Sequence, residues 1–116
     1  MSGRWVDSLP ALSRAGTQAD ALGWIAEALR VWDAGDGHLA RKYLAYAGAH
    51  LRAWRKQRER EVGHEAARVE WDSVQTITDR QLILLAHQHT ATMYAGPNSI
   101  RWAEACLREL WHWGQL

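Results

Sequence analysis

The spacing of apolar residues is the feature that most restricts what this chain can fold into. In several stretches, apolar side chains recur every three or four positions, which places them along one face of an α-helix. The sequence has no convincing alternation of apolar and polar residues of the kind that is typical of a half-buried strand. We therefore expect an all-α fold, a compact bundle of four to five helices. The clearest stripes are Ala21, Leu22, Ile25, Leu29 and Trp32, and Ile100, Ala103, Leu107 and Leu110.

Capping and breaking residues set the expected helix boundaries. Thr78 and Gln81 have the spacing of a capping box, in which each side chain accepts a hydrogen bond from the backbone N–H of the other residue. The segments DAGDG (33–37) and GPN (96–98) contain turn-forming residues that interrupt the helical pattern. A break or kink is expected at Gly63, since glycine is a poor helix former. Helices are accordingly predicted from Thr17, as a cap, to residue 32, over residues 38–62 and 79–95, and from a cap at Asn98 or Ser99 to about residue 113.

The helix predicted over residues 79–95 contains the segment LILLA (82–86), which is apolar on nearly every side. A helix that is apolar all round is buried on all faces, so we expect this one to lie at the centre of the bundle. A chain of 116 residues forms one domain on length alone. That domain is assigned to residues 1–116.

Composition argues against several classes of protein. The sequence has no apolar run of about 18 residues, so no membrane span is expected, and residues 1–16 lack the apolar core of a secretory signal. Cys106 is the single cysteine, which leaves no internal disulfide and no thiolate metal cluster. We therefore expect a cytoplasmic protein that needs no cofactor.

Charge is segregated along the chain although the formal net charge is only +1. Residues 38–60 contain seven basic residues and one acidic residue, Glu59, which gives this segment +6 and leaves −5 for the remainder. At about 100° per residue, most of the basic residues share one side of a helix, while Leu44, Ala47 and Leu51 lie on the opposite side and face the core. The basic side is made by Arg41, Arg52, Arg55, Lys56 and Arg60, with Lys42 at its edge.

Aromatic residues flank this basic side. Tyr46, His50 and Trp54 follow one another at four-residue spacing and form a ladder on a helix. Single-stranded nucleic acid is bound by cations that neutralise phosphates and by rings on which bases stack, so the segment is predicted to contact its backbone. The same pattern is also typical of a solvated helix face, which Glu61, Glu65 and Glu70 could neutralise, or of a cationic surface for a protein partner.

The tryptophan content points to protein contacts. The chain has eight tryptophans and no phenylalanine, and tryptophan is enriched at the energetic centres of interfaces. Trp111 and Trp113 are two positions apart, so their side chains point about 200° away from each other on a helix and at most one is well buried by it. We predict that Trp54, Trp111 and Trp113 contact protein neighbours.

Several combinations of residues suggest chemistry but lack what that chemistry needs. His87 and His89 are two positions apart and cannot chelate one metal ion from a regular helix. Glu61 and His64 have the Glu-x-x-His spacing of di-iron bundles, but a second such pair does not occur. Cys106 belongs to an apolar stripe, which predicts a buried structural thiol and not a nucleophile. We therefore expect no metal site and no enzymatic activity.

In size and character, and not by any motif, the chain resembles the small helical subunits of CRISPR surveillance complexes. Those subunits line a protein filament and hold nucleic acid by charge. The resemblance implies a non-catalytic subunit of a larger assembly that binds nucleic acid through residues 38–60. The alternative is a small protein–protein interaction module, such as a mobile-element inhibitor of a host factor, that binds no nucleic acid.

Overall fold

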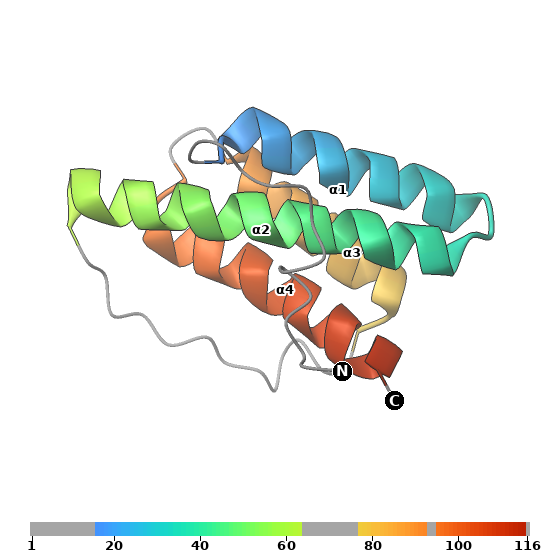
Figure 1. Cartoon of the computed structure of the whole chain (residues 1–116). Coiled ribbons are helices and arrows are strands. Elements are labelled where there is room, and N and C mark those ends of the chain that lie inside the picture. Colours follow the sequence, from blue (N-terminus) through green and yellow to red (C-terminus); the bar gives the residue numbers. More distant parts are fainter. Residues whose placement is uncertain (1–15, 64–76, 93–94, 116) are drawn as a thin grey trace.

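The described part of the chain is a bundle of four helices. The computed structural model describes residues 16–63, 77–92 and 95–115, and it describes side chains only as far as residue 110. Within these ranges every regular element is a helix, as the all-α prediction requires (Figure 1). The predicted domain of residues 1–116 extends outside the described residues. The helices are α1 (Gln18–Asp33), α2 (Gly37–Val62), α3 (Asp79–Ala91) and α4 (Pro97–Gln115).

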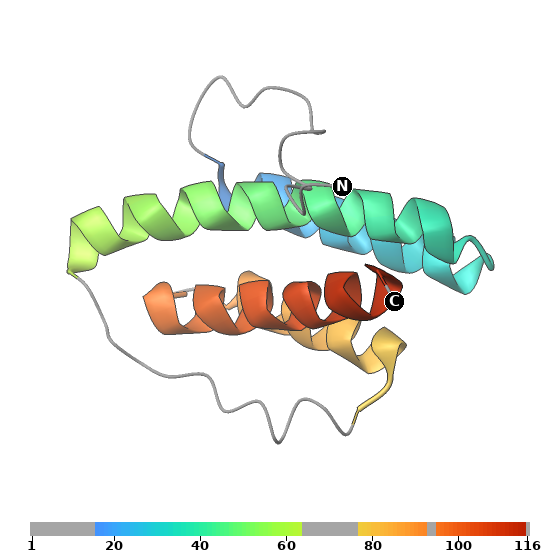
Figure 2. The same cartoon turned by 60° about the horizontal axis from the view of Figure 1, so that its bottom comes forward.

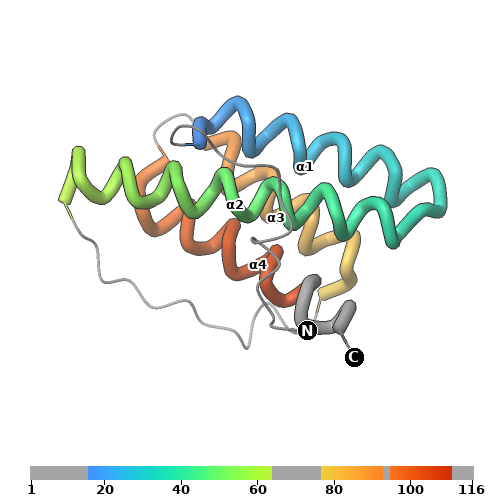
Figure 3. The backbone as a smooth tube through the Cα atoms, viewed as in Figure 1, coloured from blue at the N-terminus to red at the C-terminus, as the bar shows by residue number. Residues whose placement is uncertain are grey.

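The four helices form a ring in the order α1, α2, α4, α3. Each helix packs against two others, and the diagonal pairs α1 with α4 and α2 with α3 make no backbone contact. In Figures 1 and 3, α1 and α4 run in one direction and α2 and α3 in the other, so neighbours in the ring are antiparallel. The turned view in Figure 2 shows α1 with α2 above α3 with α4.

Side chains cap the first turns of three helices. Thr78 and Gln81 form the predicted capping box: the Thr78 hydroxyl accepts from the Gln81 N–H at 3.3 Å, and the Gln81 side-chain oxygen accepts from the Thr78 N–H at 3.0 Å. Asp36 caps α2 by accepting from the Leu39 N–H at 2.9 Å. Thr17 caps α1 in the same way. These bonds satisfy backbone donors that have no partner inside a helix.

Glycines at positive φ end the first two helices. Gly35, in the short turn after α1, has φ 93°, and Gly63 ends α2 with φ 89°. A residue with a Cβ atom rarely adopts this backbone conformation, whereas glycine does so without strain. The predicted break at Gly63 is therefore confirmed, and α2 ends at Val62.

The turn between α3 and α4 differs from the prediction. Helix α3 ends at Ala91, four residues before the expected position, and α4 begins at Pro97, so that Asn98 and Ser99, the expected caps, lie inside its first turn. Proline suits the first position of a helix because the N–H that it lacks would have no intrahelical partner there. The first hydrogen bond of α4 runs from the Ile100 N–H to the Gly96 carbonyl at 3.2 Å.

The predicted apolar stripes fill the centre of the bundle, but α3 is not its central helix. Leu82 and Ile83 are buried, whereas Leu84 is 38 % exposed. Helix α3 packs only against α1 and α4, so its outer side faces solvent, and the prediction of a helix buried on all sides is wrong. None of the described helices is both long enough and apolar enough for a membrane span. Buried residues of the other helices include Ala21, Ile25 and Ala28, Leu44, Ala47 and Leu51, and Ile100, Ala103, Leu107 and Leu110.

Candidate nucleic-acid interface

The cations that were predicted to bind nucleic acid divide into two groups on α2. Arg41 and Arg55 are partly buried against neighbouring helices, with 29 % and 20 % of their side chains exposed. The others lie on the outer side of the helix. The exposed group is Lys42, Arg52, Lys56 and Arg60.

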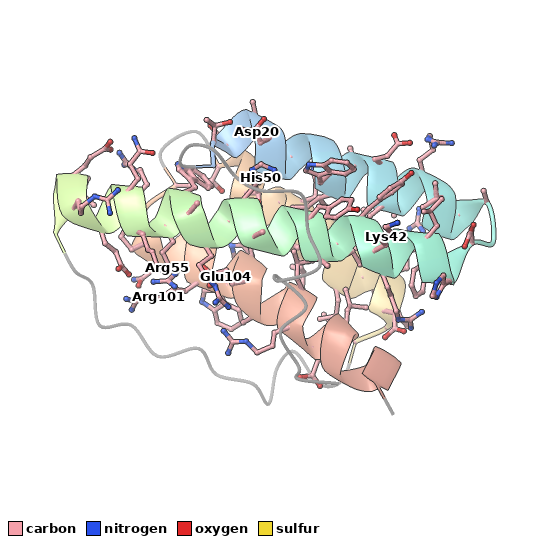
Figure 4. The ribbon with its side chains drawn as sticks, in the orientation of Figure 1. Asp20, Lys42, His50, Arg55, Arg101 and Glu104 are labelled. Atoms are coloured by element: carbon pink, nitrogen blue, oxygen red, sulfur yellow. The ribbon has the colours of Figure 1, made fainter. Side chains whose placement is uncertain are left out.

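Arg55 belongs to an ion-pair network between α2 and α4. Its Nε donates to Glu104 Oε1 at 2.5 Å, and its Nη1 donates to Glu59 Oε1 at 3.2 Å. Arg101 Nη2 reaches the same Glu59 oxygen at 2.5 Å. Figure 4 shows Arg55, Arg101 and Glu104 gathered where α2 passes over α4. Two guanidinium groups and two carboxylates therefore meet at this interface, and their formal charges cancel.

The network shifts the pKa values of Glu59 and Arg55 in the directions that favour their ionised forms. Desolvation by itself would raise the pKa of Glu59, but the hydrogen bonds from Arg101 and Arg55 outweigh it and hold this pKa below its ordinary value. Burial by itself would lower the pKa of Arg55, and its bonds to Glu104 and Glu59 reverse that effect. A phosphate would have to displace a carboxylate to reach Arg55.

Arg41 connects three helices at the other end of α2. Its guanidinium carbon lies 5.1 Å from the centre of the Trp32 ring of α1, a cation–π contact. Its Nη2 is 3.6 Å from Asp79 Oδ2 at the start of α3. The Nε of Arg41 is buried and has no hydrogen-bond acceptor among the described residues.

The aromatic ladder of α2 faces α1 and not solvent. The Tyr46 ring packs edge-on against the Trp24 ring with 4.7 Å between centres. His50 Nδ1 lies 3.9 Å from Asp20 Oδ2 of α1 (Figure 4). Trp54 is part of the core and is only 9 % exposed. These rings are therefore not available for base stacking in this fold.

The three tryptophans that were predicted to contact protein neighbours have different outcomes. Trp54 lies in the core, so its ring is not a surface contact in this structure. Trp111 and Trp113 belong to the backbone of α4, but their side chains lie outside the described residues. A protein interface at these two positions stays a prediction.

What remains on the outer side of α2 is a row of exposed cations. Lys42, Lys56 and Arg60 are exposed, and they lie within about 40° of one another around the helix axis. No ion pair joins any of the three to another described residue. The row extends over about 27 Å at a rise of 1.5 Å per residue.

Comparison with known families, curated proteins and solved structures gives no match for this chain. Across the described ranges, no three His, Cys, Asp or Glu side chains are grouped so that they could hold a metal ion. Of the residues predicted to bind nucleic acid, Lys42, Lys56 and Arg60 form the row of exposed cations on α2.

Proposed function

We propose that this domain is a non-catalytic binding subunit of a larger assembly, and that the outer side of α2 contacts the phosphates of single-stranded nucleic acid. The observation that carries the proposal is the row of Lys42, Lys56 and Arg60, which are exposed and have no ion pair within the described part of the chain. Cations of this kind replace the counterions of a phosphate backbone. Arg52 shares this side of the helix and adds a fourth positive charge.

The arrangement favours contact with the backbone over reading of bases. The rings of α2 are turned towards α1, and Trp54 is in the core. Arg41 and Arg55 already pair with Asp79, Glu104 and Glu59, so the proposal does not include them. Binding through phosphates alone is tolerant of sequence and weakens steeply as salt concentration rises. A cytoplasmic location is part of the proposal.

The test is fluorescence polarisation of a labelled single strand of about 20 nucleotides, titrated with the protein at two salt concentrations. Neutralising the row with Lys42→Gln, Lys56→Gln and Arg60→Gln should weaken binding strongly at low salt. The slope of log affinity against log salt should become shallower by about two, or about 0.7 for each phosphate contact that is lost from a single strand.

The matched control removes the same amount of charge from other helices. Arg30, Arg80 and Arg108 are exposed on α1, α3 and α4, and the triple change of these residues to Gln should leave most of the affinity intact. Equal losses in the two triple variants would show that net charge and not α2 determines binding. Absence of binding by the native protein at low salt would favour the alternative, an interaction module for an acidic protein surface.

A further inference from the structure

A hollow of about 120 Å³ lies between α2 and α4. It is distinct from the row of Lys42, Lys56 and Arg60, none of which lines it. Most of its wall is apolar, and small residues of α2 leave the space open. The apolar lining consists of Leu44, Ala45 and Gly48 from α2 and Leu107 and Leu110 from α4.

Charged side chains line the rest of the hollow, and most of them are positive. Arg41 and Arg52 come from α2 and Arg108 from α4, against one carboxylate, Glu104. Glu104 already accepts a hydrogen bond from Arg55 at 2.5 Å. Its negative charge is therefore neutralised by an arginine that does not line the hollow. The balance of the lining therefore favours an anion.

One of the arginines has unused hydrogen-bonding capacity. Arg108 is exposed and forms no ion pair with a described residue. Arg41 also lines the hollow, but its Nη2 lies 3.6 Å from Asp79 Oδ2 and its Nε is buried. An arginine fork such as that of Arg108 suits the paired oxygens of a carboxylate or phosphate.

We propose that this hollow binds a small amphipathic anion, with one aromatic ring or a short acyl chain as its body and one carboxylate or phosphate as its head. The size agrees with this class, since an apolar cavity of about 150 Å³ takes up a benzene ring. The apolar body lies on Leu44, Leu107 and Leu110, and the head meets Arg108. A few polar groups around an apolar floor are typical of small-molecule sites.

The test is an NMR titration of the ¹⁵N-labelled full chain with octanoate, hexyl phosphate, 1-octanol and inorganic phosphate. Octanoate or hexyl phosphate should move the amide signals of Gly48, Ala45 and Leu107 in a saturable way. Comparison of these two probes shows which head the site prefers. The neutral alcohol and inorganic phosphate each lack one half of the proposed ligand, so both should bind more weakly.

Substitutions of Arg108, which is exposed, test the role of its charge in binding without disturbing the core. Arg108→Gln should weaken binding of the anionic probe about three- to tenfold, since it removes a charge-assisted hydrogen bond. Arg108→Lys keeps the positive charge and should recover part of the affinity. Arg60→Gln removes an equal charge outside the hollow and should have no effect, although it belongs to the proposed nucleic-acid surface.

Three results would overturn the proposal. Octanol that binds as well as octanoate would show an apolar space without recognition of an anion. Equal losses for Arg108→Gln and Arg60→Gln would show that only net charge matters. Signals that move without saturation, or only far from the α2–α4 hollow, would show that the probes do not bind there. The nucleic-acid proposal is tested separately, because the strand-binding test neutralises Lys42, Lys56 and Arg60, none of which lines the hollow.

Discussion

Arg55 and Glu104 are 49 positions apart in the sequence, and a hydrogen bond of 2.5 Å joins Arg55 Nε to Glu104 Oε1. Only 9 % of the Glu104 side chain is exposed. An arginine that was predicted to be a surface cation therefore forms an interhelical ion pair, the tie between α2 and α4. Two helices that meet along a largely apolar interface are held in register by this pair, because its geometry permits only one alignment.

The first prediction concerns this tie. Glu104→Gln keeps the size of the side chain but removes its charge, which leaves the Arg55 guanidinium partly buried with a weaker partner. We expect the free energy of unfolding to fall by about 1–2 kcal/mol, between the values for exposed and for buried ion pairs. Urea unfolding followed by circular dichroism measures it. Glu27→Gln, which breaks an exposed pair with Arg30 on α1, should cost clearly less, and equal losses would contradict the role of the tie.

The second prediction concerns the close approach of Gly16 to α2. A Cβ atom at Gly16 would lie 2.5 Å from the backbone oxygen of His50 and 2.7 Å from its Cα. Because backbone atoms cannot move aside as a flexible side chain does, Gly16→Ala should destabilise the fold by about 1–3 kcal/mol. The midpoint of thermal unfolding should fall accordingly.

Gly23 provides the matched control for this change. It lies within α1, and a Cβ atom there meets nothing within 4 Å. Gly23→Ala should stabilise the protein by about 0.5–1 kcal/mol, since alanine is the better helix former. A Gly16→Ala variant as stable as the native chain would show that the two segments separate easily.

The third prediction concerns the effect of pH through His89. Its ring stacks on Trp102 with 5.9 Å between centres, and burial lowers its pKa below the ordinary value of 6.5. The unfolded chain therefore takes up a proton at a higher pH than the folded chain. Stability from this group is fully present above pH 6.5 and is lost as the pH falls through the lower folded pKa.

A comparison of native protein with His89→Gln isolates this contribution. The native chain should lose more unfolding free energy than the variant between about pH 7.5 and 5, as measured by urea unfolding at each pH. The variant keeps a polar side chain of similar length but does not titrate. If both chains show the same pH dependence, protonation of His89 is not coupled to unfolding.

The fourth prediction concerns Cys106, the single cysteine of the chain. Its side chain is fully buried in the core, and burial raises the pKa of the thiol to about 12. The reactive thiolate is therefore scarce near neutral pH. Alkylation by iodoacetamide at pH 8 should be slow in the folded protein and fast in urea, as mass spectrometry can follow. Rapid alkylation without urea would indicate that α4 opens readily.

The periodicity of the sequence predicted which side of α2 faces the core, and Leu44 and Leu51 are buried there. It did not predict the position of Arg55, although a signal was present. Arg55 follows Leu51 by four residues and so lies only about 40° away from it around the helix. An arginine so close to a core position lies at the edge of the interface between two helices. Its side chain therefore contacts polar side chains of the neighbouring helix.

The identity of that neighbour was beyond prediction from one sequence. Periodicity gives the buried face of each helix but not which other helix covers it, so neither the pairing of Arg55 with Glu104 nor the contact of Trp54 with the core could be derived. The same limit applies to α3. An all-apolar segment indicates burial on every side. In the structure α3 packs against only two of the other described helices, and Leu84 on its remaining side is exposed. The hollow between α2 and α4 also depends on this pairing of helices.

The order of the helices around the ring has a consequence for how the chain can be divided. Helices α2 and α3 follow each other in sequence but make no backbone contact, so the molecule consists of two antiparallel hairpins laid back to back. Among the described helices, backbone contacts between the hairpins join α1 with α3 and α2 with α4. Side chains add further links, such as the hydrogen bond from Gln18 to the Thr90 carbonyl and the ion pair of Arg41 with Asp79. A chain cut between α2 and α3 would leave both hairpins intact, and the two fragments could reassemble as halves of a split protein.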